Sequence, residues 1–396
     1  MPSTREVFVL GAARTAIGSF GGTLKDIPPI DLATATIKAA IERAGITPDR
    51  IGHVAMGNVI PTETRDAYLG RVAAVNAGVP KETPAFNVNR LCGSGLQAII
   101  SAAQAVMLGD CEFALGAGAE SMSRGPYLVP AARWGQRMGD AQLLDYMIGI
   151  LHDPFHKIHM GITAENVAEQ FGITRQQMDE LAVESHRRAA AAIAAGRFTE
   201  QIVPIEIPSR KGAIQFITDE HVKADTTLET LAKMKPAFKK DGGTVTAGNA
   251  SGLNDGAAAV VLASGDVVAA QDLKPMARLI GYAHAGVEPT IMGIGPVPAT
   301  REVLKRTGLK VSDLDVIEAN EAFAAQACAV SKGLDLDPAK VNPNGSGISL
   351  GHPVGATGAI ITTKALYELQ RIGGRYALVT MCIGGGQGIA AIFERC

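Results

Sequence analysis

A lone cysteine, Cys92, stands in a glycine-rich turn between two regular stretches. A short strand is predicted at residues 85–88 and an apolar helix at residues 96–109. Gly93 and Gly95 permit tight backbone geometry and let another molecule approach closely. The free amides at the start of the helix stabilise an anion, so we expect a lowered thiol pKa that favours the thiolate. This pattern indicates a nucleophile, although a lone cysteine is often only a small buried hydrophobe.

Three further stretches carry groups that a thiolate could use. Asn320 ends a predicted strand, His352 lies in a glycine-rich segment that opens a helix, and Cys382 precedes the glycines at 384–386. An acyl transfer to a thiolate needs a base, for which histidine is suited. A second thiol can move a proton on or off carbon, and amides of the glycine run can hold an oxyanion. Together these groups indicate acyl transfer with an added proton step, as in a Claisen condensation.

The elements that must position these groups alternate between strand and helix. The order of elements in residues 1–120 returns in residues 272–396, and the segment at 341–347 echoes the turn around Cys92. We therefore predict two copies of one α/β unit, each a mostly parallel sheet covered on both faces. If the copies face each other, Cys92 of one copy meets His352 and Cys382 of the other.

The residues between the copies depart from this pattern. They include a polar helix at 174–195 and a charged tract at 209–240, so we expect an insertion over the first domain. An apolar strand at 257–263 then rejoins the first sheet. The predicted division is an N-terminal domain of 1–120 plus 249–271, an inserted loop domain of 121–248 and a C-terminal domain of 272–396.

Composition narrows the class of protein. The net charge of −2 over 396 residues gives no electrostatic case for binding nucleic acid or an anionic membrane. The five cysteines include no Cys-x-x-Cys pair, which favours free thiols in a reducing compartment. No run reaches about 18 apolar residues, and residues 1–9 do not read as a signal peptide. We expect a soluble, cytoplasmic protein.

Four motifs in order resemble the thiolase family over essentially the whole chain. They are Asn89-Arg90-Leu91-Cys92-Gly93-Ser94-Gly95, Asn320-Glu321-Ala322-Phe323, Gly351-His352-Pro353-x-Gly355 and Cys382-x-Gly384-Gly385-Gly386. The family comprises acetyl-CoA acetyltransferases and 3-ketoacyl-CoA thiolases, and the likeness is strongest to the bacterial β-ketothiolases of polyhydroxyalkanoate synthesis. The resemblance implies a homotetramer of five-layered αβαβα subunits. It also implies ping-pong chemistry on coenzyme A thioesters, with acyl-CoA and CoA as partners and no separate cofactor.

The same resemblance implies catalytic roles at matching positions. Cys92 is the acylated nucleophile and His352 activates it. Cys382 removes a proton from the acetyl-CoA methyl group in synthesis, or returns one in thiolysis. Asn320 holds a water that forms, with His352, an oxyanion hole for the enolate. The amides of Cys92 and Gly384 form the oxyanion hole of the acyl-enzyme.

The resemblance also implies where CoA binds, under the insertion. Ser251 matches the residue that bonds the pantetheine arm, and Lys223 stands where related enzymes often carry an arginine near the nucleotide phosphates. A lysine keeps that charge but loses the bidentate fork. The other positions of the arm and acyl pocket are Leu151, His159, Met160, Phe238, Ala247, Met292 and Phe323.

Two other site types fit less well. His152, His156 and His159 have metal-ligand spacing, but Pro154 interrupts the helix that this spacing needs, so we predict no metal site. The glycines at 384–388 could cradle a phosphate. The apolar run that follows them reads as a return strand, whereas a dinucleotide site needs a helix there.

Three other functions remain to be weighed against a thiolase. A condensing enzyme of the ketoacyl synthase type has a histidine or asparagine in place of Cys382. A non-catalytic CoA-binding scaffold would have lost Cys92, His352 or Cys382, and all three are present. A thioester hydrolase would admit water to the acyl-cysteine, which the sequence does not exclude.

Overall fold

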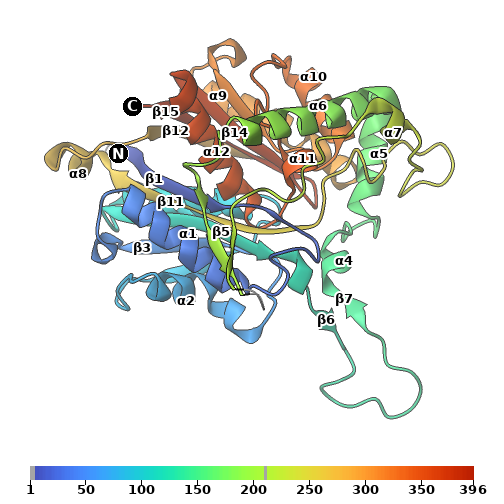
Figure 1. Ribbon diagram of the computed structural model, residues 1–396, viewed down its shortest axis with the longest axis horizontal. Coiled ribbons are helices and arrows are strands. Elements are labelled where there is room, and N and C mark those ends of the chain that lie inside the picture. The colour runs from blue at the N-terminus through green and yellow to red at the C-terminus, as the bar shows by residue number, and fades with distance from the viewer. Residues whose placement is uncertain (1–4, 209–211) are drawn as a thin grey trace.

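The computed structural model describes residues 5–208 and 212–396. Two segments named above lie partly outside the described residues: positions 1–4 of the stretch in which we expected no signal peptide, and positions 209–211 of the charged tract. The two halves of the chain lie against each other, the first in blue and cyan and the second in orange and red (Figure 1).

The first half forms a sheet with the strand order β4-β3-β5-β11-β1. Strand β3 is parallel to β4 and β5, whereas β11 is antiparallel to β5 and β1. Every residue of β5 and β11 is buried, as expected for small apolar strands covered on both faces. The bounds are β1 (Val7–Thr15), β3 (His53–Gly57), β4 (Ala85–Val88), β5 (Phe113–Ser121) and β11 (Asn254–Ser264), with short additions β2 (Gly18–Ser19) and β8 (Ile202–Val203).

The second half repeats this topology. Its strand order is β13-β14-β15-β12, with β13 parallel to β14 and the other neighbours antiparallel. At the place of β4 there is a single parallel bridge between Ile317 and Val341. The segment at 341–347, which echoes the Cys92 turn in sequence, therefore occupies the equivalent place in the fold. The bounds are β12 (Ala277–Gly286), β13 (Val316–Ala319), β14 (Tyr376–Ile383) and β15 (Gln387–Arg395).

The prediction of mostly parallel sheets is wrong. Most neighbouring pairs are antiparallel, and β1 pairs with β12 through Val7, Phe8 and Val9, which joins both halves into one eleven-stranded sheet. The reason lies partly in the connections. The tight glycine turn at 384–386 can only return the chain antiparallel, because a parallel partner needs a crossover of a dozen or more residues.

Helices and sheets alternate in five layers, αβαβα, as the resemblance to the thiolase family implied. Helices α1 and α2 cover the outer face of the first sheet, and α9 covers the outer face of the second, with α10 beside it. Between the sheets, α3 and α12 contact each other and strands of both halves. The bounds are α1 (Pro29–Arg43), α2 (Leu69–Asn76), α3 (Ser94–Leu108), α9 (Pro296–Thr307), α10 (Ala324–Leu334) and α12 (Thr357–Ile372). Shorter helices are α8 (Gly265–Ala270), α11 (Gly347–Leu350), η1 (Pro48–Arg50), η2 (Thr64–Tyr68), η3 (Met122–Arg124), η4 (Pro289–Ile294) and η5 (Val311–Asp313).

Helix α3 is the buried centre of the molecule. The stretch Leu91–Leu108 is long and apolar enough to cross a membrane by length and composition alone, yet 67% of it is buried inside the protein. Its polar residues face the second half, where Gln104 donates to the Tyr282 hydroxyl and Gln97 bonds the His284 ring, each at 2.8 Å. The narrow polar stripe therefore serves contacts between the halves.

The inserted segment packs mainly on the second half, contrary to our expectation that it covers the first. Helix α5 packs on α10 and η4, and α6 packs on α10 and α11, while β8 pairs with β1 of the first half. Helix α6 begins at the predicted place because Thr174 and Gln177 form a capping box. A hairpin with strands β6 and β7 projects from the body (Figure 1). The bounds are α4 (Tyr146–Ile150), α5 (Met160–Phe171), α6 (Arg175–Ala194), α7 (Leu228–Ala232), β6 (Tyr127–Leu128), β7 (Leu144–Asp145), β9 (Ile205–Ile207) and β10 (Ile214–Phe216).

Candidate active site

The N-terminal ends of α3 and α12 meet at backbone contact. A Cβ atom on Gly95 would lie 2.6 Å from the backbone N of Ala359, and one on Gly358 would lie 2.2 Å from that of Leu96. Glycine at both positions lets the helices approach this closely. The turn before α3 carries Cys92 and the loop before α12 carries the candidate base, so this crossing brings the two halves of the site together.

The Cys92 turn is held by its own side chains. Leu91 adopts a left-handed backbone with φ 46°, and the Asn89 Oδ1 accepts a hydrogen bond from Leu91 N at 2.9 Å. The Ser94 hydroxyl accepts from Arg90 N and donates to the Leu91 carbonyl oxygen. The residue with unusual geometry is thus Leu91, whereas we expected Gly93 and Gly95 to permit it.

Cys92 is a thiol at neutral pH, which corrects our expectation of a thiolate. Removal from water raises its pKa to about 11, outweighing the lowering effect of hydrogen bonds from the backbone N–H groups of Gly384 and Cys92. The negative charge of Glu120 raises it further. The backbone amides that we expected to lower the pKa are present, but the desolvation of the thiolate raises the pKa by more. Attack by sulfur therefore needs a base.

His352 is held in the tautomer that such a base requires. Its Nδ1 lies 2.7 Å from the Thr357 Oγ1, and that hydroxyl donates its own proton to the Pro353 carbonyl oxygen at 2.9 Å. Nδ1 must then carry the proton that the hydroxyl oxygen accepts, which leaves the lone pair on Nε2. Burial lowers the pKa of His352 to about 4, so the ring is neutral at pH 7. The backbone N–H of His352 is anchored by Asn254 Oδ1 at 2.9 Å.

Asn320 and Cys382 lie behind these two residues. Asn320 follows β13, and its Nδ2 lies 3.5 Å from each ring nitrogen of His352. Its Oδ1 is buried and has no hydrogen-bond partner among the residues that the structure describes. Cys382 lies near the end of β14 and is fully buried. Burial first, and the nearby Cys92 second, raise the pKa of the Cys382 thiol well above its ordinary range.

One cavity of about 490 Å³ collects most of the predicted positions. Cys92, His352 and Gly384 contribute to its wall, whereas Asn320 and Cys382 stand outside the lining. The predicted CoA and acyl positions that line it are Leu151, His159, Met160, Lys223, Phe238, Ala247, Ser251, Met292 and Phe323.

Aromatic contacts build one side of this cavity. The His159 ring stacks on Phe238 with a centroid distance of 4.6 Å, and Phe238 meets Phe323 edge to face at 6.3 Å. His159 also caps α5, because its Nδ1 accepts from Gly161 N. Ser251 is positioned by the Asn320 motif, since its backbone N–H donates to the Ala322 carbonyl oxygen at 2.9 Å. The inserted segment and the second half thus share this wall.

Sequence reasoning missed several residues that shape the site. His221 and Val59 line the same cavity, and Thr357, Asn254 and Glu120 hold its loops. Thr357 could have been found, since it lies within the turn of helix after His352. The others carry no local signal, because they reach the site from strands or turns remote in sequence.

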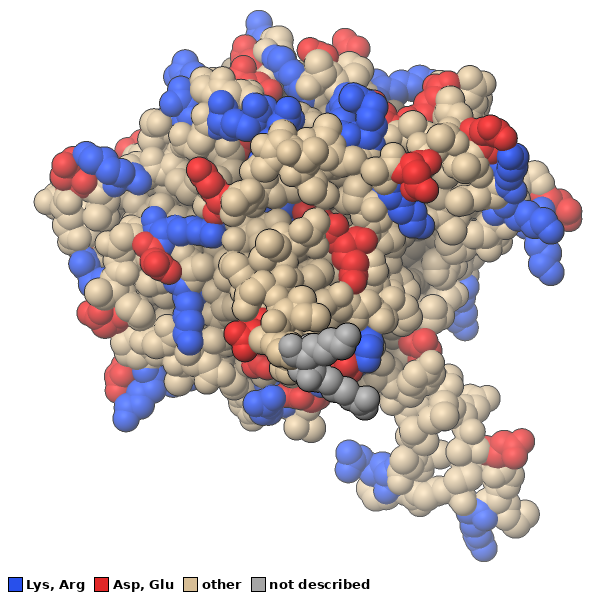
Figure 2. Space-filling model, viewed as in Figure 1, with Lys and Arg blue, Asp and Glu red and all other residues tan. Residues whose placement is uncertain are grey.

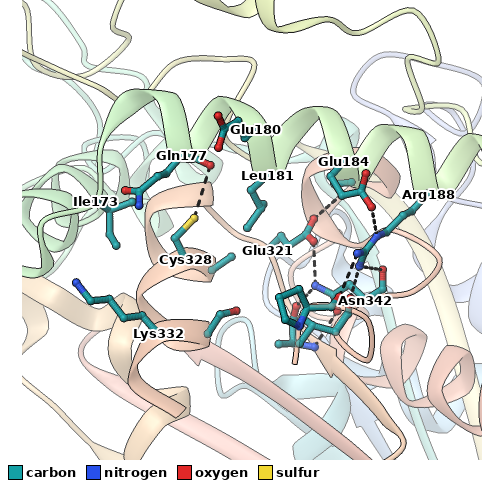
Figure 3. A pocket seen from close by; sticks show the side chains of 16 residues that line it. Ile173, Gln177, Glu180, Leu181, Glu184, Arg188, Glu321, Cys328, Lys332 and Asn342 are labelled. Atoms are coloured by element: carbon teal, nitrogen blue, oxygen red, sulfur yellow. Dashed lines mark hydrogen bonds and ion pairs between the residues drawn. The ribbon is translucent and has the colours of Figure 1, made fainter. Parts of the chain in front are cut away.

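A second cavity, of about 520 Å³, lies between α6 and α10. Figure 3 shows Gln177, Leu181 and Glu184 on the first helix, with Cys328 and Lys332 on the second. None of the predicted site residues lines this cavity.

Ser185, Glu321 and Asn342 line part of the second cavity and form a hydrogen-bond network next to Asn320. The Glu321 carboxylate accepts from the Ser185 hydroxyl at 2.6 Å and from the Asn342 amide at 2.9 Å. This network fixes the residue next to Asn320, so the cavity's inner wall supports the candidate active site.

Comparisons with known proteins agree with this geometry. Residues 7–266 match the thiolase N-terminal domain and residues 273–395 match the thiolase C-terminal domain. The beta-ketothiolase BktB of Cupriavidus necator is 67% identical over 392 residues, covering 99% of this chain and 100% of the relative. An acetyl-CoA acetyltransferase of Chromobacterium violaceum is 50% identical, covering 98% of this chain and 100% of that protein.

Solved structures show the same fold. The human mitochondrial 3-ketoacyl-CoA thiolase superposes with a TM-score of 0.97 at 46% identity, with 99% of each chain covered. A structure of the same human enzyme in complex with CoA gives a TM-score of 0.95, covering 99% of this chain and 98% of that one. The chain belongs to the thiolase family, which confirms the family and fold class predicted from its motifs.

Proposed function

We propose that this protein is a β-ketothiolase: two acyl-CoA molecules condense to a 3-ketoacyl-CoA plus CoA, and thiolysis reverses the reaction. Family membership makes it an acyltransferase. The observation that carries the proposal is the convergence of Cys92, His352 and Gly384 on one cavity, with the Cys382 sulfur close behind. Two sulfurs and one imidazole are what acyl transfer with a carbon proton step requires.

Acylation begins with a proton transfer. The Nε2 lone pair of His352 takes the Cys92 proton as the sulfur attacks the thioester carbon, and the departing CoA sulfur takes a proton back. Raising the nucleophile's pKa costs reactivity at rest, but the thiolate formed at the moment of attack is a strong nucleophile. The backbone N–H groups of Cys92 and Gly384, which already bond the resting sulfur, stabilise the oxyanion of the acyl-enzyme step.

Carbon–carbon bond formation uses the second sulfur. Once CoA has left, His352 is neutral again and takes the Cys382 proton, and the Cys382 thiolate removes a methyl proton from the second acetyl-CoA. The resulting carbanion attacks the acyl carbon on Cys92, and the Cys92 sulfur leaves and takes the proton back from His352. A buried thiolate is strongly basic because the apolar surroundings disfavour its charge. Asn320, whose buried Oδ1 has no hydrogen-bond partner in the described part of the chain, holds a water that, with His352, stabilises the enolate oxygen.

CoA occupies the cavity with its pantetheine arm beside Ser251 and the aromatic wall. Lys223 lines the cavity and forms no ion pair within residues 5–208 and 212–396, so its charge is available to the CoA phosphates. The acyl group lies among Leu151, Met160 and Met292, and the pocket wall at these residues sets the range of chain lengths.

The inserted segment serves CoA binding and assembly of a homotetramer. The hairpin that projects from the body carries a few charged side chains among uncharged ones (Figure 2) and exposes apolar side chains, with Trp134 91% and Met138 84% exposed. A patch of this kind marks an interface between proteins. We retain the predicted division into 1–120 plus 249–271, 121–248 and 272–396 as part of this proposal.

The cellular setting follows from the same reasoning. All five cysteines are free, which suits a reducing cytoplasm. The product, a 3-ketoacyl-CoA, is a precursor of the kind that polyhydroxyalkanoate synthesis consumes. A ketoacyl synthase is disfavoured by Cys382, and a scaffold by the intact set of reactive side chains.

The test is acetylation of the purified protein. Acetyl-CoA should transfer one acetyl group to the peptide containing Cys92, detected by mass spectrometry, and Cys92→Ser should remove it. Acetylation at another residue of the variant contradicts the assignment. Thiolysis of acetoacetyl-CoA, 3-ketovaleryl-CoA and longer 3-ketoacyl-CoAs then defines the acyl range, while release of free acetate in place of a thiol ester would indicate a hydrolase.

A further inference from the structure

Glu120 is a fully buried carboxylate near the end of β5. Its Oε1 accepts hydrogen bonds from Asn58 Nδ2 and from the backbone N–H of Ile60, each at 3.0 Å. Its Oε2 accepts from the backbone N–H groups of Val59 at 3.1 Å and Gly355 at 2.8 Å. Four N–H donors therefore converge on one carboxylate.

These donors come from both halves of the chain. Asn58, Val59 and Ile60 belong to the turn after β3, whereas Gly355 belongs to the loop that carries His352. In the same place Val59, Ile60, Met122, Met147 and Val354 form an apolar cluster, against which Leu91 and Cys92 pack. The carboxylate thus fastens the His352 loop to the wall on which the Cys92 turn rests.

The loop that carries His352 packs so closely against the Glu120 carboxylate that a side chain at Gly355 would clash. A Cβ atom on Gly355 would lie 2.4 Å from Glu120 Oε2 and 3.0 Å from the Cα of Asn58. On the same strand, a Cβ on Gly118 would lie 2.6 Å from the Gly355 carbonyl oxygen. Glycine on both sides brings the loop and the strand to backbone contact, so a change at Glu120 is transmitted to the loop.

The hydrogen bonds to Glu120 favour its charged form, whereas its burial opposes that form. Within residues 5–208 and 212–396 it forms no ion pair, and the groups that bond it are N–H donors. Burial raises its pKa to about 8, against the lowering effect of the N–H groups of Ile60, Gly355 and Val59, so Glu120 is charged over the alkaline range in which Cys92, with a pKa of about 11, titrates. Its charge reaches Cys92, whose pKa it raises. Glu120 therefore acts on the nucleophile and on the loop of the base.

We propose that Glu120 is a positioning residue that holds the His352 loop against the Cys92 turn across the junction of the two halves. It touches neither substrate nor reacting atoms; it fixes the relative placement of the base and the sulfur. A misplacement of about 1 Å in such a pair can slow a reaction about 10²-fold. The inference rests on the proposed acylation of Cys92 and deepens it.

The test uses Glu120→Gln and Glu120→Asp in the full-length protein. One readout is the single-turnover rate of Cys92 acetylation by acetyl-CoA at about pH 9, where Glu120 with its pKa of about 8 is charged. The other is the pH profile of Cys92 alkylation by iodoacetamide, read on the Cys92 peptide. Glutamine removes the charge and turns an NH₂ group toward N–H donors, so acetylation should slow by about 10²-fold and the alkylation profile should move to lower pH. Aspartate keeps the charge but falls one methylene short, so acetylation should slow while the alkylation profile stays in place.

Asp255→Asn provides the matched control. Asp255 is a buried carboxylate on the neighbouring strand, opposite Ser121, and it bonds Ser123 of its own half. Its loss should leave both readouts within about twofold, because its side-chain partner among the described residues, Ser123, belongs to the same half. Equal slowing in Asp255→Asn and Glu120→Gln would overturn the proposal, as would acetylation at the unaltered rate in Glu120→Gln.

Gly355→Ala supplies a second route if Glu120→Gln does not fold. Its methyl group would push the loop from an intact Glu120, so acetylation should slow while the charge near Cys92 remains. An unaltered rate in Gly355→Ala would also overturn the proposal. If the unaltered protein itself is never acetylated at Cys92, the proposed function fails; if it is acetylated and the variants match it, only the role of Glu120 fails.

Discussion

Gly95 and Gly358 each lie against the backbone of the other's helix, where the N-terminal turn of α3 crosses that of α12. The two glycines occupy related places in the two halves, one in the motif of Cys92 and the other after the motif of His352. The site is therefore built on a contact between the halves in which backbone meets backbone.

Replacing Gly358 by alanine should destabilise the protein. The new methyl group would lie 2.2 Å from the backbone N of Leu96, and backbone in a packed helix cannot move aside cheaply. We expect a loss of about 1–3 kcal/mol in the free energy of unfolding by urea. Gly149→Ala in α4 is the control, because a Cβ there meets nothing within 4 Å. An equal loss in both variants would mean that the crossing is not tight.

Thr357→Val should slow catalysis with little change in fold. Valine keeps the shape of threonine but removes the hydroxyl that accepts the Nδ1 proton of His352 at 2.7 Å. Without that partner the ring can carry its proton on Nε2, where the base needs a lone pair. We expect kcat for thiolysis to fall by about tenfold or more, within the range that a general base contributes. Thr357→Ser should restore most of the rate; a serine variant as slow as valine would contradict the tautomer argument.

Stability should fall in mild acid partly because of His352. Burial lowers its pKa from 6.5 to about 4, so the unfolded chain binds a proton between these values that the folded protein does not. Stability from this group is present above pH 6.5 and is lost as the pH falls toward 4. Between pH 7 and pH 5 the loss should be about 2 kcal/mol. His352→Gln should lose that much less over the same interval, measured by urea unfolding at each pH; parallel losses in both proteins would exclude a buried neutral ring.

Cys382→Ser should separate the two chemical stages. The variant keeps Cys92 and His352, so we expect acetylation of Cys92 by acetyl-CoA to persist. It should fail to exchange the methyl protons of acetyl-CoA with deuterium oxide, followed by NMR, because a serine hydroxyl is a far weaker base catalyst. Cys328→Ser, altered in the second cavity, should exchange normally. Exchange at the normal rate in Cys382→Ser would remove the role assigned to this sulfur.

The projecting hairpin should hold the proposed homotetramer together. Trp134 is 91% exposed, and glutamate there would place a charge in the proposed apolar interface. We expect Trp134→Glu to lower the mass in solution from tetramer to dimer, measured by light scattering. Leu108→Glu is the control, since Leu108 is 75% exposed at the far end of α3. A tetramer that survives Trp134→Glu places the interface elsewhere.

The order of strands and helices could be predicted because it depends on local patterns. Residues 85–88 and α3 were expected nearly where they occur, since an apolar run next to a glycine turn is visible in the sequence. The relative direction of neighbouring strands could not be predicted in this way. It depends on how connections such as the 384–386 turn and the long insertion return the chain, and hydrophobic patterns carry no strand direction.

The sequence by itself determined which side chains can react and how they are grouped, because a cysteine, a histidine and a glycine run are chemical identities that need no fold to be recognised. Only the tertiary structure decided the protonation state of these side chains. The sequence suggested a thiolate at Cys92, whereas burial makes it a thiol with a pKa of about 11. Desolvation is a sum over atoms contributed by both halves, and Glu120 reaches the site from a strand 28 residues further along the chain. Neither the desolvation of Cys92 nor the proximity of Glu120 can be inferred until the chain is folded.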